Sequence, residues 1–394
     1  MTKKDKSPGN RFVHNKNGVI GPHEFRSKTI KVKDIGDYPG VPDVYLEVCK
    51  LYGPQLEGPP LCDELVSLIQ HMFNEEEASA VRHLTPNSML TAEYVAEREN
   101  RPAAEIRKVL DRLADEKHII MSLGQNESKV YMILPLVPGA FELVLVRTSM
   151  DSLTDWHRKF AKLFEDLYET GFIIDYVGKN PPAIRYLPIG TFISTHPMAL
   201  PSDFLEEVLD PFKSFAVGLC QCRLTEEIVG RGCGRPKDNC TSMGDMAEMA
   251  IAAGQMRRVE KKELIEIKKE AEASGLVNWA MMQDIIPGSS SMCSCCGCCC
   301  HGMRIISEFN MPGQIAPPHF MPKVVLEKCD YCGKCATACP MAAVSIDTKN
   351  KARSFQTTRC VGCGQCLAAC DKKHAIVLEP VPDYVPPIVI GKQG

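Results

Sequence analysis

The stretch CDYCGKCATACP, residues 329–340, places Cys329, Cys332, Cys335 and Cys339 in the pattern C-x2-C-x2-C-x3-C-P. The stretch CVGCGQCLAACD, residues 360–371, repeats the pattern with Cys360, Cys363, Cys366 and Cys370, and has Asp371 where the first run has Pro340. Three thiolates at intervals of three residues can surround one face of a metal cluster on a tight loop. Each run then needs a fourth ligand from elsewhere, and the other run can supply it.

This spacing is the signature of bacterial ferredoxins with two 4Fe-4S clusters, in which the fourth cysteine of each run ligates the other cluster. We therefore predict one cluster on Cys329, Cys332, Cys335 and Cys370, and a second on Cys360, Cys363, Cys366 and Cys339. A zinc site would use four ligands in two pairs instead of two identical runs of four. Short strands are expected after each run, at residues 344–346 and 376–377.

A second group of cysteines precedes the ferredoxin runs. It comprises Cys220, Cys222, Cys233, Cys240, Cys293, Cys295, Cys296, Cys298, Cys299 and Cys300, and ends at His301. Ten thiols exceed the need of one cluster, and neighbouring side chains of an extended chain diverge. We expect Cys220, Cys222, Cys233 and Cys240 to supply much of one further 4Fe-4S cluster and a subset of residues 293–300 to supply another. A noncubane cluster, a redox-active disulfide or zinc chemistry are the alternatives. His301 is expected to support a ligand or lie at the surface.

The remaining composition indicates a reducing environment. The chain has 394 residues, 20 cysteines and a formal net charge of −3. Its cysteines are grouped by metal spacing, and no leader segment or apolar span is apparent, so a cytoplasmic location is expected. Cys49 and Cys62 are interpreted as ordinary thiols.

The expected fold class is α+β with several domains. Residues 1–40 form a flexible or partner-ordered arm, 41–147 a winged-helix-like domain, 148–319 a mainly helical connector and cysteine-rich region, 320–380 the two-cluster ferredoxin domain and 381–394 a tail. Apolar spacing predicts helices at 61–73, 75–84, 91–98 and 102–117, followed by a hairpin of 118–121 and 129–133. Further along, we expect a strand at 134–147, a helix capped by Ser152, and helices at 201–215 and 259–274.

The winged-helix-like region has the order of elements of a DNA-binding module, but its charge opposes that use. Residues 61–133 carry 13 acidic and 8 basic side chains. Phosphate neutralisation needs a basic face, so nucleic acid is not the expected partner. Docking or dimerisation is the preferred interpretation, and formation of a homo-oligomer is left open.

Taken in order, these features resemble a family of 4Fe-4S dicluster-domain proteins from anaerobes. The resemblance rests on the segment CQCR at 220–223, Cys233, Cys240, GLV at 275–277, CSCCGCCC at 293–300 and the two ferredoxin runs. It implies an electron-transfer protein, or such a subunit of an anaerobic oxidoreductase complex, that passes single electrons along several 4Fe-4S clusters to redox partner proteins.

Two other classes of function stay open. One is a redox-sensing regulator that binds DNA through the winged helix, and the other is a reductase whose central cluster has an open iron site. No dinucleotide or nucleotide-phosphate motif is present, so no catalytic residue is predicted and any such cofactor would belong to a partner. Arg223 and Arg304 either offset cluster charge or face an anionic substrate such as a CoA ester.

Overall fold

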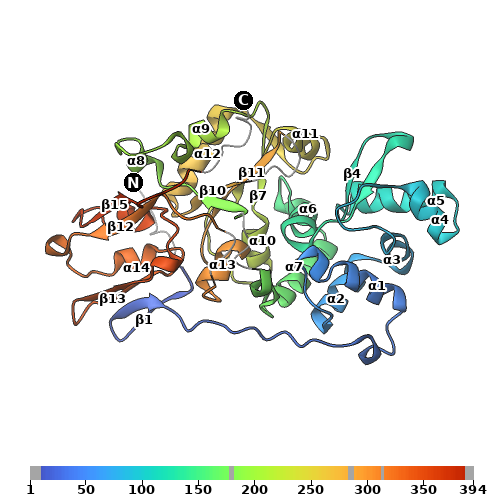
Figure 1. Ribbon diagram of the computed structural model, residues 1–394, viewed down its shortest axis with the longest axis horizontal. Coiled ribbons are helices and arrows are strands. Elements are labelled where there is room, and N and C mark those ends of the chain that lie inside the picture. The colour runs from blue at the N-terminus through green and yellow to red at the C-terminus, as the bar shows by residue number, and fades with distance from the viewer. Residues whose placement is uncertain (1–9, 177–181, 283–287, 312–314, 387–394) are drawn as a thin grey trace. The chain divides into compact units, whose positions relative to one another are not determined.

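The structure is a computed structural model that describes residues 10–176, 182–282, 288–311 and 315–386 (Figure 1). The chain forms two compact units. The N-terminal unit comprises Ser27–Val146 and Met150–Tyr176, and the cysteine unit comprises Met1–Arg26, Arg147–Ser149 and Val177–Gly394. Every cysteine of the two predicted metal-binding regions belongs to the cysteine unit. None of the helices in the described ranges has the length and apolar character needed to cross a bilayer.

The N-terminal unit consists of helices with a small antiparallel sheet of order β3-β5-β4. Side-chain caps define several helix starts, since Asn74 accepts a hydrogen bond from the Glu77 amide at 2.8 Å and Thr91 one from the Tyr94 amide at 3.3 Å. Its elements are α1 (Asp43–Leu51), α2 (Asp63–Met72), α3 (Glu75–Val81), β3 (Leu90–Thr91), α4 (Ala92–Glu99), α5 (Ala103–Asp111), β4 (Met121–Leu123), β5 (Val130–Met132), α6 (Phe141–Leu145) and α7 (Asp155–Tyr168).

Most of the expected elements of this unit occur where the sequence places them. The four helices and the hairpin follow in the expected order, whereas the winged-helix assignment itself stays a prediction. The strand expected at 134–147 is wrong, because α6 occupies part of it and packs Phe141 on Phe164 with ring centroids 4.1 Å apart. A continuous apolar run does not distinguish a strand from a buried helix. The cap of α7 is Thr154, not Ser152.

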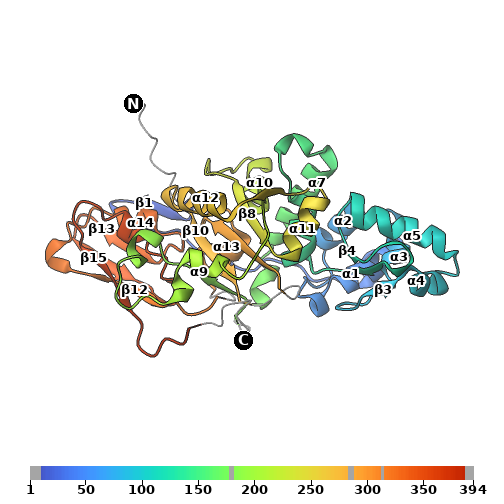
Figure 2. The ribbon, with the colours of Figure 1, turned by 90° about the horizontal axis from the view of Figure 1, so that it is seen from above.

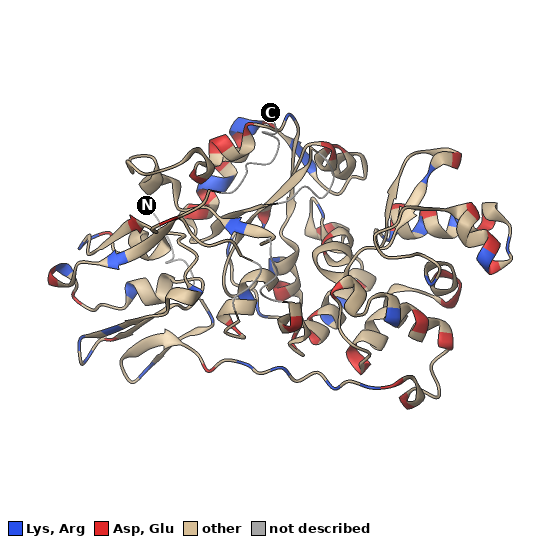
Figure 3. Cartoon of the chain, in the orientation of Figure 1, with Lys and Arg blue, Asp and Glu red and all other residues tan. Residues whose placement is uncertain are grey.

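Positions of Lys and Arg are interspersed with positions of Asp and Glu along helices α2 to α5 (Figure 3). Arg112 lies 2.9 Å and Lys117 2.6 Å from the carboxylate of Glu77, and Arg107 pairs with Glu93. These basic groups are therefore occupied by carboxylates of the same unit, which agrees with the acidic balance of the sequence.

The centre of the cysteine unit is a six-stranded antiparallel sheet of order β6-β10-β11-β8-β7-β9. Its strands are β6 (Ile184–Tyr186), β7 (Phe215–Leu219), β8 (Asp238–Met243), β9 (Arg257–Val259), β10 (Val277–Met281) and β11 (Ser290–Cys295). The accompanying helices are α8 (Gly190–Ile193), α9 (Leu205–Leu209), α10 (Gln221–Ile228), α11 (Asp245–Ala252), α12 (Lys261–Ala273) and α13 (His301–Ser307). Leu209, Phe215, Val217, Leu264 and Met292 form a buried core between the sheet and α9 and α12.

The helices expected in the central region are therefore accompanied by a six-stranded sheet that was not predicted. The α+β class holds, but strands β8 and β11 consist largely of Cys, Ser, Thr, Asn and Met, which lack the alternation of large apolar residues that identifies strands in a sequence. Their pairing comes from long-range backbone hydrogen bonds, which local sequence does not reveal. Likewise the expected helix at 201–215 is reduced to α9, and Phe215 begins β7.

The ferredoxin part is built from two antiparallel pairs of strands, and Figure 2 shows β12, β13 and β15 from above. Strand β12 (Phe320–Val324) pairs with β15 (Ile376–Pro380), and β13 (Val344–Asp347) pairs with β14 (Ala352–Phe355). Two short helices, α14 (Lys334–Ala338) and α15 (Gln365–Ala368), lie within the cysteine runs.

The N-terminal segment adds two strands to this part. Strands β1 (Val13–Lys16) and β2 (Val19–Pro22) form a hairpin, and β2 pairs with β13 through Ile20 and Ile346. Residues 13–22 are thus part of a sheet instead of the expected flexible or partner-ordered arm. Residues 1–9 and 387–394, at the ends of the predicted arm and tail, lie outside the described residues.

Candidate metal centres

The two ferredoxin runs enclose two separate cavities, each lined by three cysteines of one run and one of the other. A cavity of about 110 Å³ is lined by Cys329, Cys332, Cys335 and Cys370. The second cavity is lined by Cys339, Cys360, Cys363 and Cys366. The structure therefore brings together the same two crossed sets that the spacing predicts, although ligation itself stays a prediction.

Backbone conformation explains how each run can surround a cavity. Gly333 and Gly364 precede α14 and α15 in equivalent positions, with φ angles of 80° and 81°. Glycine adopts this left-handed conformation without steric cost, and the chain can turn sharply between the second and third cysteine of each run.

The surroundings of these sets suit an anionic cluster. Burial raises the pKa of Cys360 to about 12 and that of Cys335 to about 11, and Arg353 opposes the shift at both thiols. Arg353 therefore favours the thiolate form of one cysteine in each set. Its Nε and Nη2 atoms are buried without a hydrogen-bond partner among the described residues, so they are donors that cluster sulfides could use. The residues present thus fit two 4Fe-4S clusters.

The ten central cysteines divide into two sets. The larger, which we call the six-thiol set, consists of Cys220, Cys222, Cys240, Cys293, Cys295 and Cys300. Cys222 is in hydrogen-bonding contact with Cys220 and Cys300, Cys295 with Cys300 and Cys293, and Cys293 with Cys240. These thiols come from β8, β11 and the starts of α10 and α13, so the central sheet and two helix starts bring them together.

Polar groups point at the six-thiol set from several elements. The indole Nε1 of Trp279 on β10 donates to the Cys295 sulfur at 2.9 Å, and the His301 Nδ1 atom lies 3.3 Å from the Cys222 sulfur. His301 therefore supports a predicted ligand, which is one of the two roles expected for it. Lys268 on α12 is fully buried and donates to the Asn239 carbonyl at 2.9 Å.

Two buried cations face these thiols. Burial lowers the pKa of Lys268 to about 8, and the thiols of Cys293 and Cys240 oppose this shift. Burial also acts to lower the pKa of Arg223, but the thiols of Cys220 and Cys296 raise it above its ordinary value. Both cations can balance the charge of ligated thiolates.

The smaller group, which we call the four-thiol set, consists of Cys233, Cys296, Cys298 and Cys299, whose sulfur atoms all lie within 4.8 Å of one another. The Cys233 and Cys296 sulfurs are 4.0 Å apart, and those of Cys298 and Cys299 are 3.7 Å apart. The structure thus divides the central cysteines differently from the expected partition, because Cys233 joins the residues of the turn at 296–299 instead of Cys220, Cys222 and Cys240. Cys233 joins this set because the loop at 230–236 folds against the turn at 296–299.

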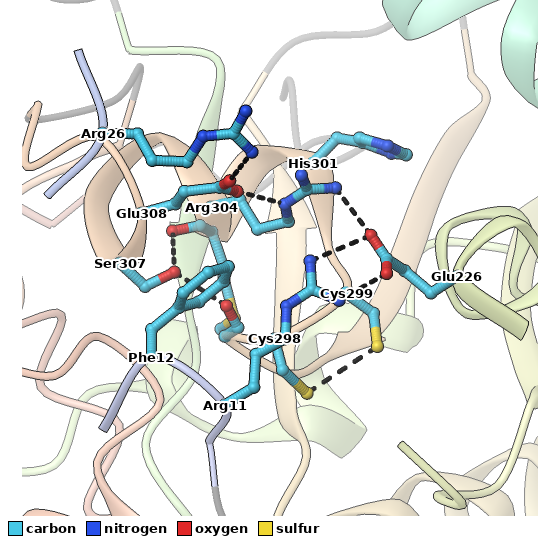
Figure 4. A network of polar contacts seen from close by, with 12 residues as sticks. Arg11, Phe12, Arg26, Glu226, Cys298, Cys299, His301, Arg304, Ser307 and Glu308 are labelled. Atoms are coloured by element: carbon cyan, nitrogen blue, oxygen red, sulfur yellow. Dashed lines mark hydrogen bonds and ion pairs between the residues drawn. The ribbon is translucent and has the colours of Figure 1, made fainter. Parts of the chain in front are cut away.

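A buried ion network lies next to the turn that carries the four-thiol set (Figure 4). Arg304 is fully buried and contacts Glu226 at 2.7 Å and Glu308 at 2.6 Å, while Arg26 reaches Glu308 at 2.8 Å and Arg11 also pairs with Glu226. Arg304 is therefore paired with two carboxylates of the same unit. This geometry does not support the alternative in which Arg304 faces an anionic substrate. The network ties residues 10–26 to α10 and α13.

Three supporting residues were missed by sequence reasoning. Tyr186, Lys268 and Trp279 lie outside the cysteine motifs, and a buried lysine within an otherwise charged helix resembles a solvated one in the sequence. Only the packing of α12 and β10 on the central sheet shows their relation to the thiols. Cys49 and Cys62 lie in the N-terminal unit and are buried, as ordinary thiols often are.

Comparison with known proteins agrees with the geometry of the C-terminal part. Residues 321–371 match the family model of the 4Fe-4S dicluster domain. Neither a curated protein nor a solved structure matches the chain. The matched residues include all eight cysteines of the two crossed sets, and together with the central cysteine clusters the domain indicates iron-sulfur electron transfer.

Proposed function

We propose that the protein is an electron-transfer subunit of an anaerobic oxidoreductase complex, and that it passes single electrons along several 4Fe-4S clusters between redox partner proteins. Two clusters would be held by the crossed ferredoxin sets and a further cluster by thiols of the six-thiol set. The observation that carries the proposal is that two crossed sets of four thiols line separate cavities, and that a third set of six thiols lies in the same compact unit.

The six-thiol set and one ferredoxin set share a hydrophobic core, which supports electron transfer between them. Tyr186, Cys295, Cys300, Met341 and Cys363 are all buried members of this core. Burial raises the pKa of Tyr186, and the thiols of Cys300, Cys295 and Cys363 raise it further, so this ring lies near both sets. Its hydroxyl is buried without a partner among the described residues, and a cluster sulfide would provide an acceptor.

The other ferredoxin set is the one closer to the surface. Cys332 is exposed, whereas Cys363 of the second set is buried. The cavity that Cys332 lines is also bordered by Lys334, Lys372 and Lys373, together with two aspartates. A partner protein that docks here would approach this cluster closely, so we place the exchange of electrons with a partner at this site.

The clusters, when bound, supply one-electron chemistry, and the chain controls their environment. The cysteines hold the irons, the shared core excludes water, and Trp279, Arg223 and Lys268 stabilise negative charge at the six-thiol set. Hydrogen bonds, net charge and burial are the properties by which a protein sets the potential of such centres.

The test is the content of iron and acid-labile sulfide in protein purified without air, combined with electron paramagnetic resonance during stepwise reduction. We expect about twelve irons per chain, about eight of them in the ferredoxin domain, and reducible signals that interact magnetically. The variant Cys295→Ala/Cys300→Ala should lose the central signal and keep the ferredoxin pair, and Cys49→Ser should keep all signals. Clusters that are absent from the ferredoxin domain, or that no reductant reduces, would refute the proposal.

A further inference from the structure

The four-thiol set is more compact than the ferredoxin set of Cys329, Cys332, Cys335 and Cys370. Its four sulfur atoms lie within 4.8 Å of one another, and two of its pairs are 4.0 and 3.7 Å apart. In the set of Cys329, Cys332, Cys335 and Cys370, by contrast, the thiols surround a cavity of about 110 Å³.

Sulfur atoms this close together match the coordination of a single ion. Zinc is bound tetrahedrally by thiolates at a distance of about 2.3 Å, which places the sulfurs of a tetrahedron about 3.8 Å apart. Cys296 and Cys299 also have the C-x2-C spacing common in zinc sites, and Cys233 and Cys298 complete the four ligands.

The surroundings are those of a closed structural site. Cys296, Cys298 and Cys299 are buried against Ala271 and Leu276, and Cys233 is half-buried. Four protein thiolates fill the tetrahedral positions of a zinc ion, so none is left open for a substrate. The Arg235 guanidinium donates to the Cys298 sulfur at 3.4 Å, and Arg223 interacts with Cys296. Four thiolates around one divalent cation have a net charge of −2, and these two arginines balance it.

We propose that Cys233, Cys296, Cys298 and Cys299 bind one zinc ion, which has a structural role and takes no part in electron transfer. The ion fastens the loop at 230–236 to the turn at 296–299, which also lies between Cys295 and Cys300 of the six-thiol set. Zinc binding would therefore fix the two ends of this segment and position both thiols. The inference does not depend on the proposed electron transfer, since a zinc ion undergoes no redox change.

The experiment measures zinc, iron and acid-labile sulfide per chain in anaerobically purified protein, and zinc-edge X-ray absorption on the same sample. We expect one zinc per chain with a single shell of four sulfurs at about 2.3 Å. The variant Cys298→Ser/Cys299→Ser should lose the zinc and retain its ferredoxin signals. The matched variant Cys295→Ser/Cys300→Ser, altered in the neighbouring set, should lose iron and retain the zinc.

Several outcomes would overturn the inference. They are a wild-type protein without zinc, zinc with nitrogen or oxygen ligands, a single iron in place of zinc, and a Cys298→Ser/Cys299→Ser variant that keeps its full zinc content. The absorption measurement needs only the wild-type protein, so the inference can be refuted even if neither variant folds.

Discussion

At the scale of single residues, Trp279 is the side chain that we expect to influence the reduction potential of a central cluster most directly. Its indole N–H donates to the Cys295 sulfur at 2.9 Å. A hydrogen bond to a cluster ligand stabilises the more negative, reduced state, so its loss should lower the reduction potential. One hydrogen bond of about 1 kcal/mol corresponds to about 40 mV for a one-electron couple.

We therefore predict that Trp279→Phe shifts the central potential to more negative values by about 40 mV, as measured by a redox titration followed by paramagnetic resonance. The other tryptophan of the chain is a matched control, because Trp156 lies in the N-terminal unit. Trp156→Phe should leave all cluster potentials unchanged. An unchanged potential in Trp279→Phe would show that Cys295 is not a cluster ligand.

A second prediction at this scale concerns Gly297, within the turn of the four-thiol set. A Cβ atom at this position would lie 1.6 Å from the Pro340 carbonyl oxygen, and neither backbone can move without displacing a cysteine-bearing segment. Gly297→Ala should destabilise the cysteine unit by about 3 kcal/mol and lower the midpoint of its thermal unfolding.

Gly302 provides the comparison for Gly297→Ala. It lies in α13, and the nearest atom to a Cβ there is the Cys300 sulfur at 3.8 Å, which is an ordinary contact. Gly302→Ala should leave the midpoint unchanged or raise it, since alanine favours a helix over glycine by roughly 0.5–1 kcal/mol. Equal midpoints for the two variants would contradict the close packing of the two segments.

At the scale of secondary-structure elements, the hairpin β1–β2 protects one ferredoxin site. A Cβ atom on Gly333 would lie 2.2 Å from the Cδ1 atom of Ile20, so this side chain covers the loop between Cys332 and Cys335. Ile20 also packs against Ala336 and Ile346.

We expect Ile20→Ala to remove at least about 1 kcal/mol of this packing and to open the loop more often. Iron should then leave the Cys329 site roughly fivefold faster in the presence of a chelator, as followed by the decay of its visible absorption. Val19 is exposed and should tolerate the same change, so Val19→Ala should release iron at the wild-type rate. Equal rates in both variants would show that the hairpin does not protect the cluster.

At the scale of the whole molecule, the two units differ in their dependence on metal. The N-terminal unit has a core of buried apolar side chains from its helices, whereas the cysteine unit contains all eighteen cysteines of the predicted metal sites. Metal binding contributes directly to the folding free energy where ligands must be brought together. Removal of metal should therefore unfold the cysteine unit and leave the N-terminal unit folded.

Each unit contains one tryptophan, so fluorescence can follow the two units separately. In the Trp156→Phe variant, the fluorescence of the remaining Trp279 follows the cysteine unit. The midpoint temperature of its thermal transition should fall sharply after treatment with acid and chelator. In Trp279→Phe, the remaining Trp156, stacked on His71 at 5.1 Å, should show a transition that the treatment leaves unchanged. A single transition shared by both probes would mean that the two units unfold as one.

The sequence by itself determined the ferredoxin part of the molecule. The positions of eight cysteines are enough to predict two crossed sets, because the ligand spacing of a cubane is short and local, and the structure brings these sets together around two cavities. The helices of the N-terminal unit could also be predicted, since their apolar residues recur at helical intervals and Thr91 caps one of them.

Only the tertiary structure decided how the central cysteines are grouped. Ten thiols on two segments allow many partitions, and the one observed depends on pairing between β8 and β11 and on the loop that carries Cys233. The sheet itself was missed because its strands are rich in Cys and Ser instead of alternating large apolar residues. Contacts between residues far apart in the chain, such as Trp279 with Cys295 or Ile20 with Gly333, follow from packing and leave no periodic pattern in the sequence.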